Sequence, residues 1–385
     1  MTDLNSCRLC GYSKMSASVR LTAMPRWNHR LLQQNEIATD EAIDLSAYQC
    51  PSCGFVCVLK QLSDDYYDDY VNAPSVSMQA QRFQSDQAQE FVGRFNLSGR
   101  QVLEVGCGDG FFLQSMQNAG AVCTGVEPSK LQRELARSRG LKVESGVLSS
   151  GRKLADGPFD AFATRQVLEH VEDMRDFLLT IRGNLCSNAV GLVEVPNLDK
   201  LVEEGRFFDF IPEHINYFNP LSLGLVLQLT GFEVLDICSV QDGESLRALV
   251  RRASLPNCDS LVKRVASLRS DMAGFLAACE ATGKKLAIWG AGGKGLSMMA
   301  VLDLGSIRLL VDKDPHKIGL FTPVSHLRVE HPRELAQQAI DVVVVMAPAY
   351  EREIVRELRD NLGFIGEIVL AGRGFEKLGR LGDVN

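Results

Sequence analysis

The chain has 385 residues, of which 45% are hydrophobic and 23% charged, and its formal net charge is -7. This length exceeds one ordinary core and predicts two or three domains of a globular protein. No apolar run approaches the roughly 20 residues of a membrane-spanning helix, the first residues do not resemble a signal peptide, and no lysine- or arginine-rich stripe indicates a nucleic-acid footprint. We therefore expect a cytoplasmic protein that binds neither membranes nor nucleic acid.

Residues 1–62 contain two CxxC motifs, each followed by glycine. Their cysteines are Cys7, Cys10, Cys50 and Cys53. In a reducing compartment such cysteines are better interpreted as metal ligands than as disulfides, and four thiolates suit tetrahedral zinc. A closed four-cysteine site leaves no open coordination position, so we expect the Zn²⁺ to be structural. Four unrelated thiols are the alternative, and Cys57, close to the second motif, is the spare.

Residues 63–250 are expected to form one α/β domain. A helix is predicted around 79–95, followed by amphipathic helices that alternate with apolar strands near 101–106, 121–126, 159–164 and 190–195. This alternation favours a parallel, doubly wound sheet.

The first of these strands enters a glycine-rich turn, and the next strand ends in a carboxylate. The residues concerned are Glu104, Gly106, Gly108, Asp109, Gly110 and Glu127. Glycines let the backbone approach a ligand closely, and a carboxylate at the tip of the second strand can accept both ribose hydroxyls of a nucleoside. The order acid-x-Gly-x-Gly-x-Gly differs from the GxGxxG of dinucleotide sites and resembles motif I of the class I S-adenosylmethionine (SAM) methyltransferases. The resemblance implies a SAM site here; a tight strand-to-helix turn of any α/β fold is the alternative.

The strand near 159–164 leads into the segment Arg-Gln-Val-Leu-Glu-His-Val at 165–171. This segment resembles the fourth-strand region of the same superfamily, which implies that Gln166 and His170 face the cofactor or the substrate from the start of a helix. The alternative for His170 is a helix-start residue that only packs.

Residues 251–283 are predicted as a helical linker, and residues 284–385 as a smaller Rossmann-like domain that binds substrate. Its strands are predicted at 286–289, 309–311 and 340–346. The alternation of strand, glycine loop and helix repeats the plan of the first domain on a smaller scale.

A second glycine loop follows the strand at 286–289, and the next strand ends in Asp312. The loop residues expected to meet the substrate are Gly290, Gly292, Gly293 and Lys294. A helix N-terminus favours anions, and Lys294 adds a cation there, which suits a diphosphate. A nucleotide-sugar diphosphate site, a purely structural turn and an NAD site are the three alternatives for this loop.

The order of a four-cysteine module, a SAM-type domain and a C-terminal Rossmann-like domain resembles the nucleotide-sugar C-methyltransferases, which C-methylate dTDP-linked keto-deoxysugars. The resemblance covers nearly the whole chain and is carried by segments 212–218, 243–247, 289–295 and 312–319. It implies an α/β class I SAM methyltransferase fold with an N-terminal zinc module and a smaller C-terminal Rossmann-like domain. It also implies a reaction centre at Glu213 and His214, a contact of Tyr70 with the sugar, and substrate binding at Arg247.

The chemistry gives these side chains roles. Methylation of a carbon beside a ketone requires loss of the α-proton, which a neutral histidine can accept near neutral pH. His214 is the expected base, and Glu213 would hold its tautomer or raise its basicity. The enolate oxygen then needs a hydrogen-bond donor such as Tyr70 or Tyr217. A capped turn before a helix at 220–222 is the alternative for Glu213 and His214.

Some substrate-facing positions depart from the family pattern. Ile211 stands in place of a tyrosine, Pro212 replaces a polar residue, and 242–245 reads Asp-Gly-Glu-Ser instead of His-Gly-Gly-Ser. Another nucleotide sugar, or O- or N-methylation of a sugar or glycan precursor, is therefore the main alternative. A zinc-ribbon binding protein and an NAD oxidoreductase are the others. The chain is expected to act on its small-molecule nucleotide sugar as a monomer or homodimer.

Overall fold

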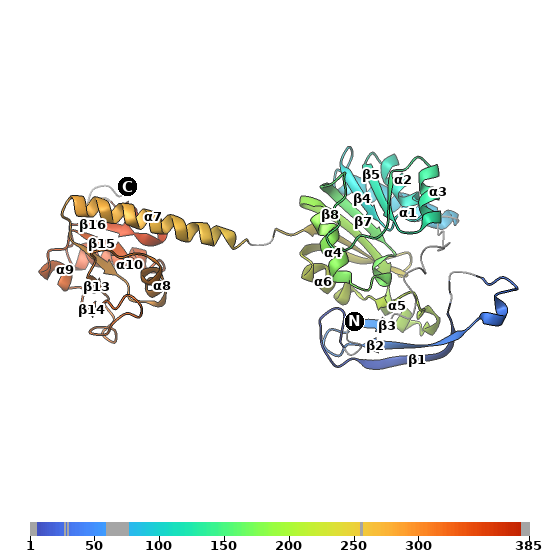
Figure 1. The fold of residues 1–385 in the computed structure, drawn as a ribbon, viewed down its shortest axis with the longest axis horizontal. Helices are drawn as coiled ribbons and strands as arrows, with labels where there is room; N and C mark the ends of the chain where they lie inside the picture. Colours follow the sequence, from blue (N-terminus) through green and yellow to red (C-terminus); the bar gives the residue numbers. More distant parts are fainter. Residues whose placement is uncertain (1–5, 27, 29–30, 59–76, 255–256, 379–385) are drawn as a thin grey trace. The chain divides into compact units, whose positions relative to one another are not determined.

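The computed structural model describes residues 6–26, 28, 31–58, 77–254 and 257–378. The chain divides into two compact units, Met1–Leu255 and Pro256–Asn385. Figure 1 shows both units, each with its own sheet structure. Among the described helices, none is long and apolar enough to cross a membrane.

Most of a four-stranded antiparallel sheet comes from the part of the chain that carries the cysteine motifs, and this part is drawn mainly in dark blue in Figure 1. In sheet order its strands are β1 (Ser16–Pro25), β2 (Ala42–Gln49), β3 (Val56–Val58) and β9 (Asn216–Tyr217), with the short helix η1 (Ile37–Thr39) between β1 and β2 in the chain. Val56 pairs with Tyr217, and Cys57 pairs with Asn216. A backbone ladder therefore joins the N-terminal part of the chain to the segment that follows His214.

A seven-stranded sheet forms the centre of the first unit. In sheet order its strands are β10 (Phe232–Val240), β11 (Ser245–Arg252), β8 (Leu185–Pro196), β7 (Phe159–Arg165), β4 (Gln101–Val105), β5 (Val122–Glu127) and β6 (Val143–Ser145). The expected parallel arrangement is confirmed from β8 to β6, but β11 runs antiparallel to both of its neighbours. Residues 241–244 alone join β10 to β11, and parallel strands need a crossover of about a dozen residues or more.

Helices cover both faces of this sheet (Figure 1). Within residues 78–229 the helices are α1 (Met78–Arg94), α2 (Phe111–Asn118), α3 (Lys130–Ser138), η4 (Leu168–His170), α4 (Met174–Gly183), α5 (Leu198–Glu203), η5 (Phe207–Asp209) and α6 (Pro220–Leu229). Val102 packs in the core with Phe91 of α1, whereas Leu103 packs in the core with Phe177 of α4. Successive strand residues face opposite sides of a sheet, so β4 supplies both cores and its end lies between them.

The second unit has one six-stranded sheet. In sheet order its strands are β14 (Val329–Glu330), β13 (Leu309–Val311), β12 (Leu286–Trp289), β15 (Val342–Val345), β16 (Glu367–Leu370) and β17 (Glu376–Leu378), of which only β17 is antiparallel to its neighbour. Its helices are α7 (Asp259–Ala281), α8 (Gly293–Val301), α9 (Glu334–Gln337), α10 (Glu351–Arg356), the π-helix η6 (Glu357–Asn361) and η7 (Ala371–Arg373). Met272 and Phe275 of α7 pack with Ile288 and Val344, so the helix predicted as a linker contributes to this core.

Candidate functional site

The turn after β4 needs glycine at three positions, for two different reasons. Gly106, Gly108 and Gly110 all have positive φ angles, of +74°, +52° and +80°. A Cβ atom on Gly106 would lie 2.3 Å from Val167 Cγ2, and one on Gly110 would lie 2.4 Å from Leu141 Cδ1, so packing excludes a side chain at both. A Cβ atom on Gly108 would meet no atom within 4 Å. Gly108 therefore leaves free space beside the backbone, as close approach of a ligand requires.

Three carboxylates surround this turn. Glu127 accepts hydrogen bonds from the backbone N–H of Gly108 at 2.9 Å and of Ser129 at 2.8 Å, and burial raises the pKa of its carboxyl. Glu104 is 2% exposed, its Oε2 has no hydrogen-bond partner among the described residues, and burial raises its pKa to about 8. Asp109 forms an ion pair with Arg139, with a distance of 2.9 Å between Oδ2 and Nη2. The turn is thus acidic, which suits a cationic ligand.

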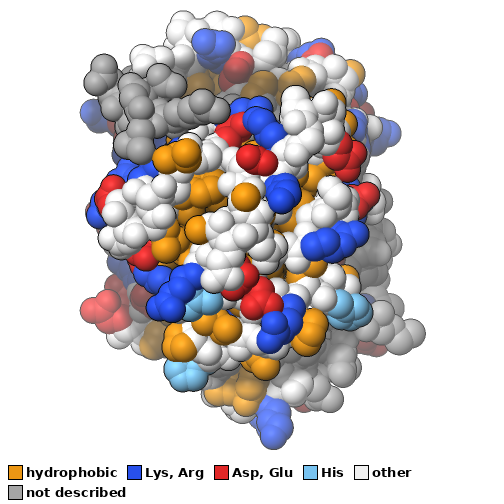
Figure 2. Space-filling model, turned by 90° about the vertical axis from the view of Figure 1, so that its left-hand side faces the viewer, with side chains coloured by type: hydrophobic (Ala, Val, Ile, Leu, Met, Phe, Trp, Pro, Cys, Tyr) orange, Lys and Arg blue, Asp and Glu red, His pale blue; other side chains and the backbone are white. Residues whose placement is uncertain are grey.

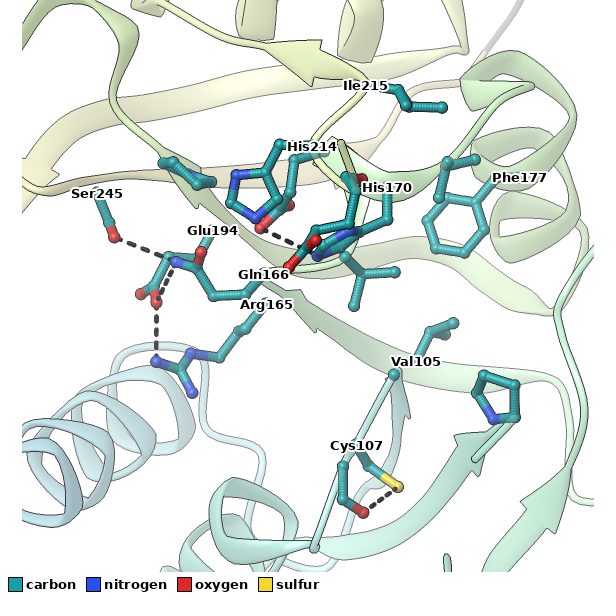
Figure 3. A pocket seen from close by; sticks show the side chains of 18 of the residues that line it. Val105, Cys107, Arg165, Gln166, His170, Phe177, Glu194, His214, Ile215 and Ser245 are labelled. Atoms are coloured by element: carbon teal, nitrogen blue, oxygen red, sulfur yellow. Dashed lines mark hydrogen bonds and ion pairs between the residues drawn. The ribbon is translucent and has the colours of Figure 1, made fainter. Parts of the chain in front are cut away.

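A cavity of about 1120 Å³ opens over this turn, large enough for a cofactor together with a small substrate. All predicted cofactor residues line it, namely Glu104, Gly106, Gly108, Asp109, Glu127, Gln166 and His170, and so do Glu213, His214 and Tyr217. Figure 3 looks into this cavity. Tyr70 lies outside the described residues. Arg247 does not line the cavity: its guanidinium is paired with Glu90 at 2.8 Å and Asp236 at 3.5 Å.

His170 and His214 lie next to each other in the cavity, with ring centroids 4.8 Å apart and ring planes at 75° (Figure 3). Burial lowers the pKa of His170 to about 4. Burial, together with the neighbouring His170, holds the pKa of His214 well below its usual value. His170 Nδ1 lies 2.9 Å from the backbone carbonyl oxygen of Glu213, which can only accept a hydrogen bond. Both imidazoles are thus neutral, and the proton of His170 is on Nδ1.

The hydroxyl of Tyr217 is held by the backbone. It donates to the carbonyl oxygen of Asp209 at 3.2 Å and accepts from the N–H of Ile211 at 3.0 Å, and burial raises its pKa. The single hydroxyl proton is therefore already used within residues 209–217. Of the two tyrosines expected to donate to an enolate, Tyr217 therefore already donates to the backbone, and Tyr70 lies outside the described residues.

A network of charged and polar side chains lies beside the turn (Figure 3). Sequence reasoning did not predict this network. Arg165 at the end of β7 pairs with Glu194 of β8 at 2.8 Å, and its guanidinium lies 4.5 Å from the ring centroid of Phe112. Gln87 of α1 donates to Glu194 at 2.6 Å, and Gln166 donates to Ser245 at 3.1 Å. The charged side chains in otherwise apolar strands were the available signal, since buried charges are rare unless paired.

The four predicted zinc ligands lie together. The Sγ atoms of Cys7 and Cys53 are 3.7 Å apart, those of Cys10 and Cys50 are 3.6 Å apart, and all four lie within 4.8 Å of one another. Tetrahedral Zn²⁺ with Zn–S bonds of about 2.3 Å requires sulfur atoms about 3.8 Å apart. The cluster therefore fits a tetrahedral ion, and the separations are too long for disulfides.

The first CxxC motif is hydrogen-bonded to the segment that carries His214. Arg8 donates to the carbonyl oxygen of Ile215 at 2.9 Å and to Asn216 Oδ1 at 3.4 Å. Asn216 Nδ2 in turn donates to the carbonyl oxygens of Leu168 at 3.0 Å and Val171 at 2.7 Å, at the two ends of η4. The cysteine module thus supports the backbone around both histidines of the cavity.

The predicted substrate loop of the second unit lies between β12 and α8. A Cβ atom on Gly295 would lie 2.1 Å from the carbonyl oxygen of Gly290, whereas one on Gly292 or Gly293 would meet nothing within 4 Å. Lys294 is exposed in the first turn of α8. Basic and acidic side chains are interspersed on the face shown in Figure 2. The loop offers open backbone and one cation, with no ligand chemistry beyond that.

Comparisons with known proteins match the two units of the chain to two different domain models. Residues 78–237 match the model of a methyltransferase domain, and residues 251–371 match that of a C-methyltransferase C-terminal domain. The C-methyltransferase NovU of Streptomyces niveus is 23% identical over 397 residues, which cover 94% of either chain. The ubiquinone biosynthesis O-methyltransferase of Bordetella parapertussis is 39% identical over 93 residues, which cover 22% of this chain and 37% of that protein. The solved magnesium protoporphyrin IX methyltransferase of Synechocystis PCC 6803, with bound SAH, aligns with 49% of this chain and 97% of its own at 17% identity and a TM-score of 0.39.

The matched methyltransferase domain contains β4, the glycine turn and the strands that border the cavity. The resemblance to class I SAM methyltransferases inferred from the motif is therefore confirmed for the fold and for the enzyme class. The matched C-terminal domain contains the second glycine loop. The chain is thus a SAM-dependent methyltransferase whose C-terminal part matches the model of a C-methyltransferase C-terminal domain.

Proposed function

We propose that this enzyme methylates a carbon beside the ketone of a nucleotide-linked keto-deoxysugar. The observation that carries the proposal is the shared cavity, which is lined both by the glycine turn and by Glu213 and His214. SAM binding alone does not require two neutral imidazoles beside the cofactor turn, so these histidines are available for a role in the reaction. The full-length similarity to the C-methyltransferase NovU supports the same reaction type.

The residues around the first turn fit SAM, which is a cation with a nucleoside at one end. Glu127 would accept the ribose hydroxyls, Gly106 and Gly108 would let the backbone approach, and Glu104 and Asp109 would supply negative charge near the sulfonium and ammonium groups. The Oε2 atom of Glu104 is buried without a hydrogen-bond partner among the described residues, as expected for a group that awaits a ligand. When bound, SAM supplies an electrophilic methyl group for the carbon nucleophile and leaves as S-adenosylhomocysteine.

His214 is the proposed base. Its imidazole takes the α-proton of the sugar, the C–H electron pair moves into the enolate, and the carbon then forms the new C–C bond. Glu213 would orient His214, and Gln166 and His170, which line the same cavity, would border the substrate. Tyr70 is the proposed donor to the enolate oxygen, because the hydroxyl proton of Tyr217 is already used by Asp209.

The second glycine loop is the proposed site for the nucleotide diphosphate. Gly292 and Gly293 leave the backbone amides at the start of α8 accessible, and the exposed Lys294 adds a charge-assisted donor. Gly290 shapes the turn with a φ of +125°. This assignment supports a nucleotide sugar rather than a free sugar as the substrate.

The experiment that tests the proposed function compares His214→Ala with His316→Ala, an exposed histidine of the second unit. A general base typically contributes about 10²–10⁴-fold, so His214→Ala should lose turnover by that factor while it still binds SAM. Wild-type enzyme should exchange the substrate α-proton with deuterated solvent in the absence of SAM, and His214→Ala should not. Unchanged exchange in His214→Ala would contradict the role of His214 as base.

Transfer to an oxygen or nitrogen of a sugar or glycan precursor is the second candidate. The local identity to a ubiquinone biosynthesis O-methyltransferase, 39% over 93 residues, favours it. Proton exchange at carbon separates the two reactions, because methylation of a hydroxyl or amine requires no enolate. A product whose new methyl group is bonded to oxygen or nitrogen would establish the second candidate.

The four-cysteine cluster is proposed to hold one structural Zn²⁺. So small a segment has little core of its own, and removal of the metal should unfold it. Metal analysis should give one equivalent for wild-type protein and none for Cys50→Ser/Cys53→Ser. Cys57→Ser is the matched control, because this buried neighbour lies outside the cluster and should keep the zinc. Wild-type protein purified without zinc would contradict the assignment.

A further inference from the structure

A second group of potential metal ligands lies in the cavity, separate from the cysteines. The carboxylate of Glu169 and the imidazoles of His170 and His214 place one ligand atom each within 4.8 Å of the others. Glu169 is 1% exposed, and neither of its carboxylate oxygens has a hydrogen-bond partner among the described residues. A buried carboxylate without such partners is costly unless a proton or a cation compensates it.

The orientation of His170 adds an independent argument. Its Nδ1 carries the proton, because the carbonyl oxygen of Glu213 lies 2.9 Å away and can only accept. Nε2 therefore presents a lone pair, and this atom lies 4.0 Å from Oε1 of Glu169. Two electron-rich atoms thus face each other across a gap that a cation can bridge. A ring N–H that donates to a backbone carbonyl is also the usual support of a metal-bound histidine.

The backbone holds these ligands in place from both sides. Glu169 and His170 belong to η4, and the N–H of Ile215, next to His214, donates to the carbonyl oxygen of Glu169 at 2.8 Å. The side chain of Asn216 bonds to the carbonyl oxygens at both ends of η4. The two segments that carry the ligands are therefore fixed to each other, as a preorganised site requires.

We propose that Glu169, His170 and His214 bind a divalent transition-metal cation of the Zn²⁺ or Co²⁺ type. Two imidazole nitrogens favour these ions over Mg²⁺, which prefers oxygen ligands. Three protein ligands leave a coordination position open toward the cavity. His214 cannot offer the same nitrogen lone pair to a metal and to a proton. The metal therefore inhibits proton abstraction, a consequence that rests on the proposed function.

The test is a calorimetric titration of Co²⁺ into full-length, zinc-replete protein. Wild-type enzyme should bind one equivalent with no thiolate-to-cobalt charge-transfer absorption, which separates this site from the cysteines. Glu169→Gln, which keeps the shape of the side chain, should bind Co²⁺ at least about tenfold more weakly. Glu244→Gln is the matched control: Glu244 also lines the cavity, but it is paired with Arg206 and should not affect the affinity.

Equal affinity in wild type and Glu169→Gln, or no binding by the wild type, would overturn the metal site. His170→Gln provides a second variant in case Glu169→Gln does not fold, and its affinity should fall by a similar factor. Methyl transfer measured with added Co²⁺ then separates the two proposals. Inhibition supports both, stimulation keeps the metal site and overturns His214 as base, and normal turnover without any Co²⁺ binding keeps the proposed function alone.

Discussion

The chain contains two glycine loops, and their surroundings differ in charge. Each loop follows a buried strand, and each precedes a helix. Two residues before its first glycine, the loop after β4 has Glu104, whereas the loop after β12 has Ile288 at the equivalent place. At the start of its helix, the second loop has the exposed Lys294. The glycine loop of the first unit thus lies among acidic side chains, which suits a cationic ligand. The loop of the second unit has a basic residue beside it, which suits an anionic ligand.

The acids at the tips of the following strands differ as well. Glu127 accepts hydrogen bonds only from backbone amides among the contacts described for it, those of Gly108 and Ser129. Asp312 accepts from the N–H of Ala291 at 2.8 Å and also lies 3.3 Å from Nζ of Lys317. A carboxylate that is already paired with a lysine is a poorer partner for ribose hydroxyls. The comparison therefore indicates that two glycine loops can suit different ligands when the charges around them differ.

The sharpest test of this comparison is a matched pair of substitutions, Gly108→Val and Gly292→Val. A β-branched residue at the positive φ of Gly108 is strained and fills the space beside the turn, so SAM binding should fall by at least about a hundredfold. Gly292 has a φ of -91°, so valine fits the backbone there and should leave SAM affinity unchanged. Isothermal titration with SAM measures both. The distinction between the loops fails if the two variants lose SAM affinity equally.

The second test replaces each of the two acids at the strand tips by alanine. Glu127→Ala removes a charged acceptor of two ribose hydroxyls, and hydrogen bonds to charged groups contribute about 1.5–3 kcal/mol each. SAM affinity should therefore fall by tenfold or more, whereas Asp312→Ala should have no effect on it. Circular dichroism controls for folding, because Glu127 also caps the turn. A SAM dissociation constant that is unchanged in Glu127→Ala would refute the ribose contact.

Lys294→Ala tests the basic side of the comparison. Loss of one charge-assisted contact should weaken binding of dTDP, used as the nucleotide probe, by about tenfold. SAM affinity should not change. Lys313→Ala is the control, since this lysine is exposed and paired with Glu353 outside the loop. Parallel loss of both ligands in Lys294→Ala would point to a folding defect instead of a phosphate contact.

The smallest expected effect is on pH dependence. Burial raises the pKa of Glu104 to about 8, with further contributions from Asp109 and Glu127, and Arg165 opposes the shift. Free enzyme therefore binds a proton here at neutral pH, and a cationic ligand favours its release. SAM affinity should rise as the pH increases toward about 8, by less than tenfold per unit, and should level off above it, and Glu104→Gln should abolish this rise. Calorimetry in buffers of different ionisation enthalpy measures the released proton.

Sequence reasoning located most of the first site because its signals are local. Three glycines at alternate positions, an acid before them and an acid on the next strand can all be recognised from spacing alone, and all of them except Gly110 line one cavity. The two CxxC motifs likewise brought four sulfur atoms together. Arg247 was not brought to the cavity, because side chains along β11 alternate between faces and its partners are Glu90 and Asp236.

The amino-acid sequence by itself indicated the strands that border the two glycine turns, the turns themselves and the four clustered cysteines, since these follow from hydrophobic periodicity and residue spacing. Tertiary structure decided the relations between distant segments. It placed the carboxylate of Glu169, which has no hydrogen-bond partner among the described residues, beside two histidines that are 44 positions apart. It also paired the hydroxyl of Tyr217 with the backbone of its own loop and linked Arg8 to Ile215. Such contacts depend on how elements pack across a sheet, and the residues that make them leave no periodic signal in the chain.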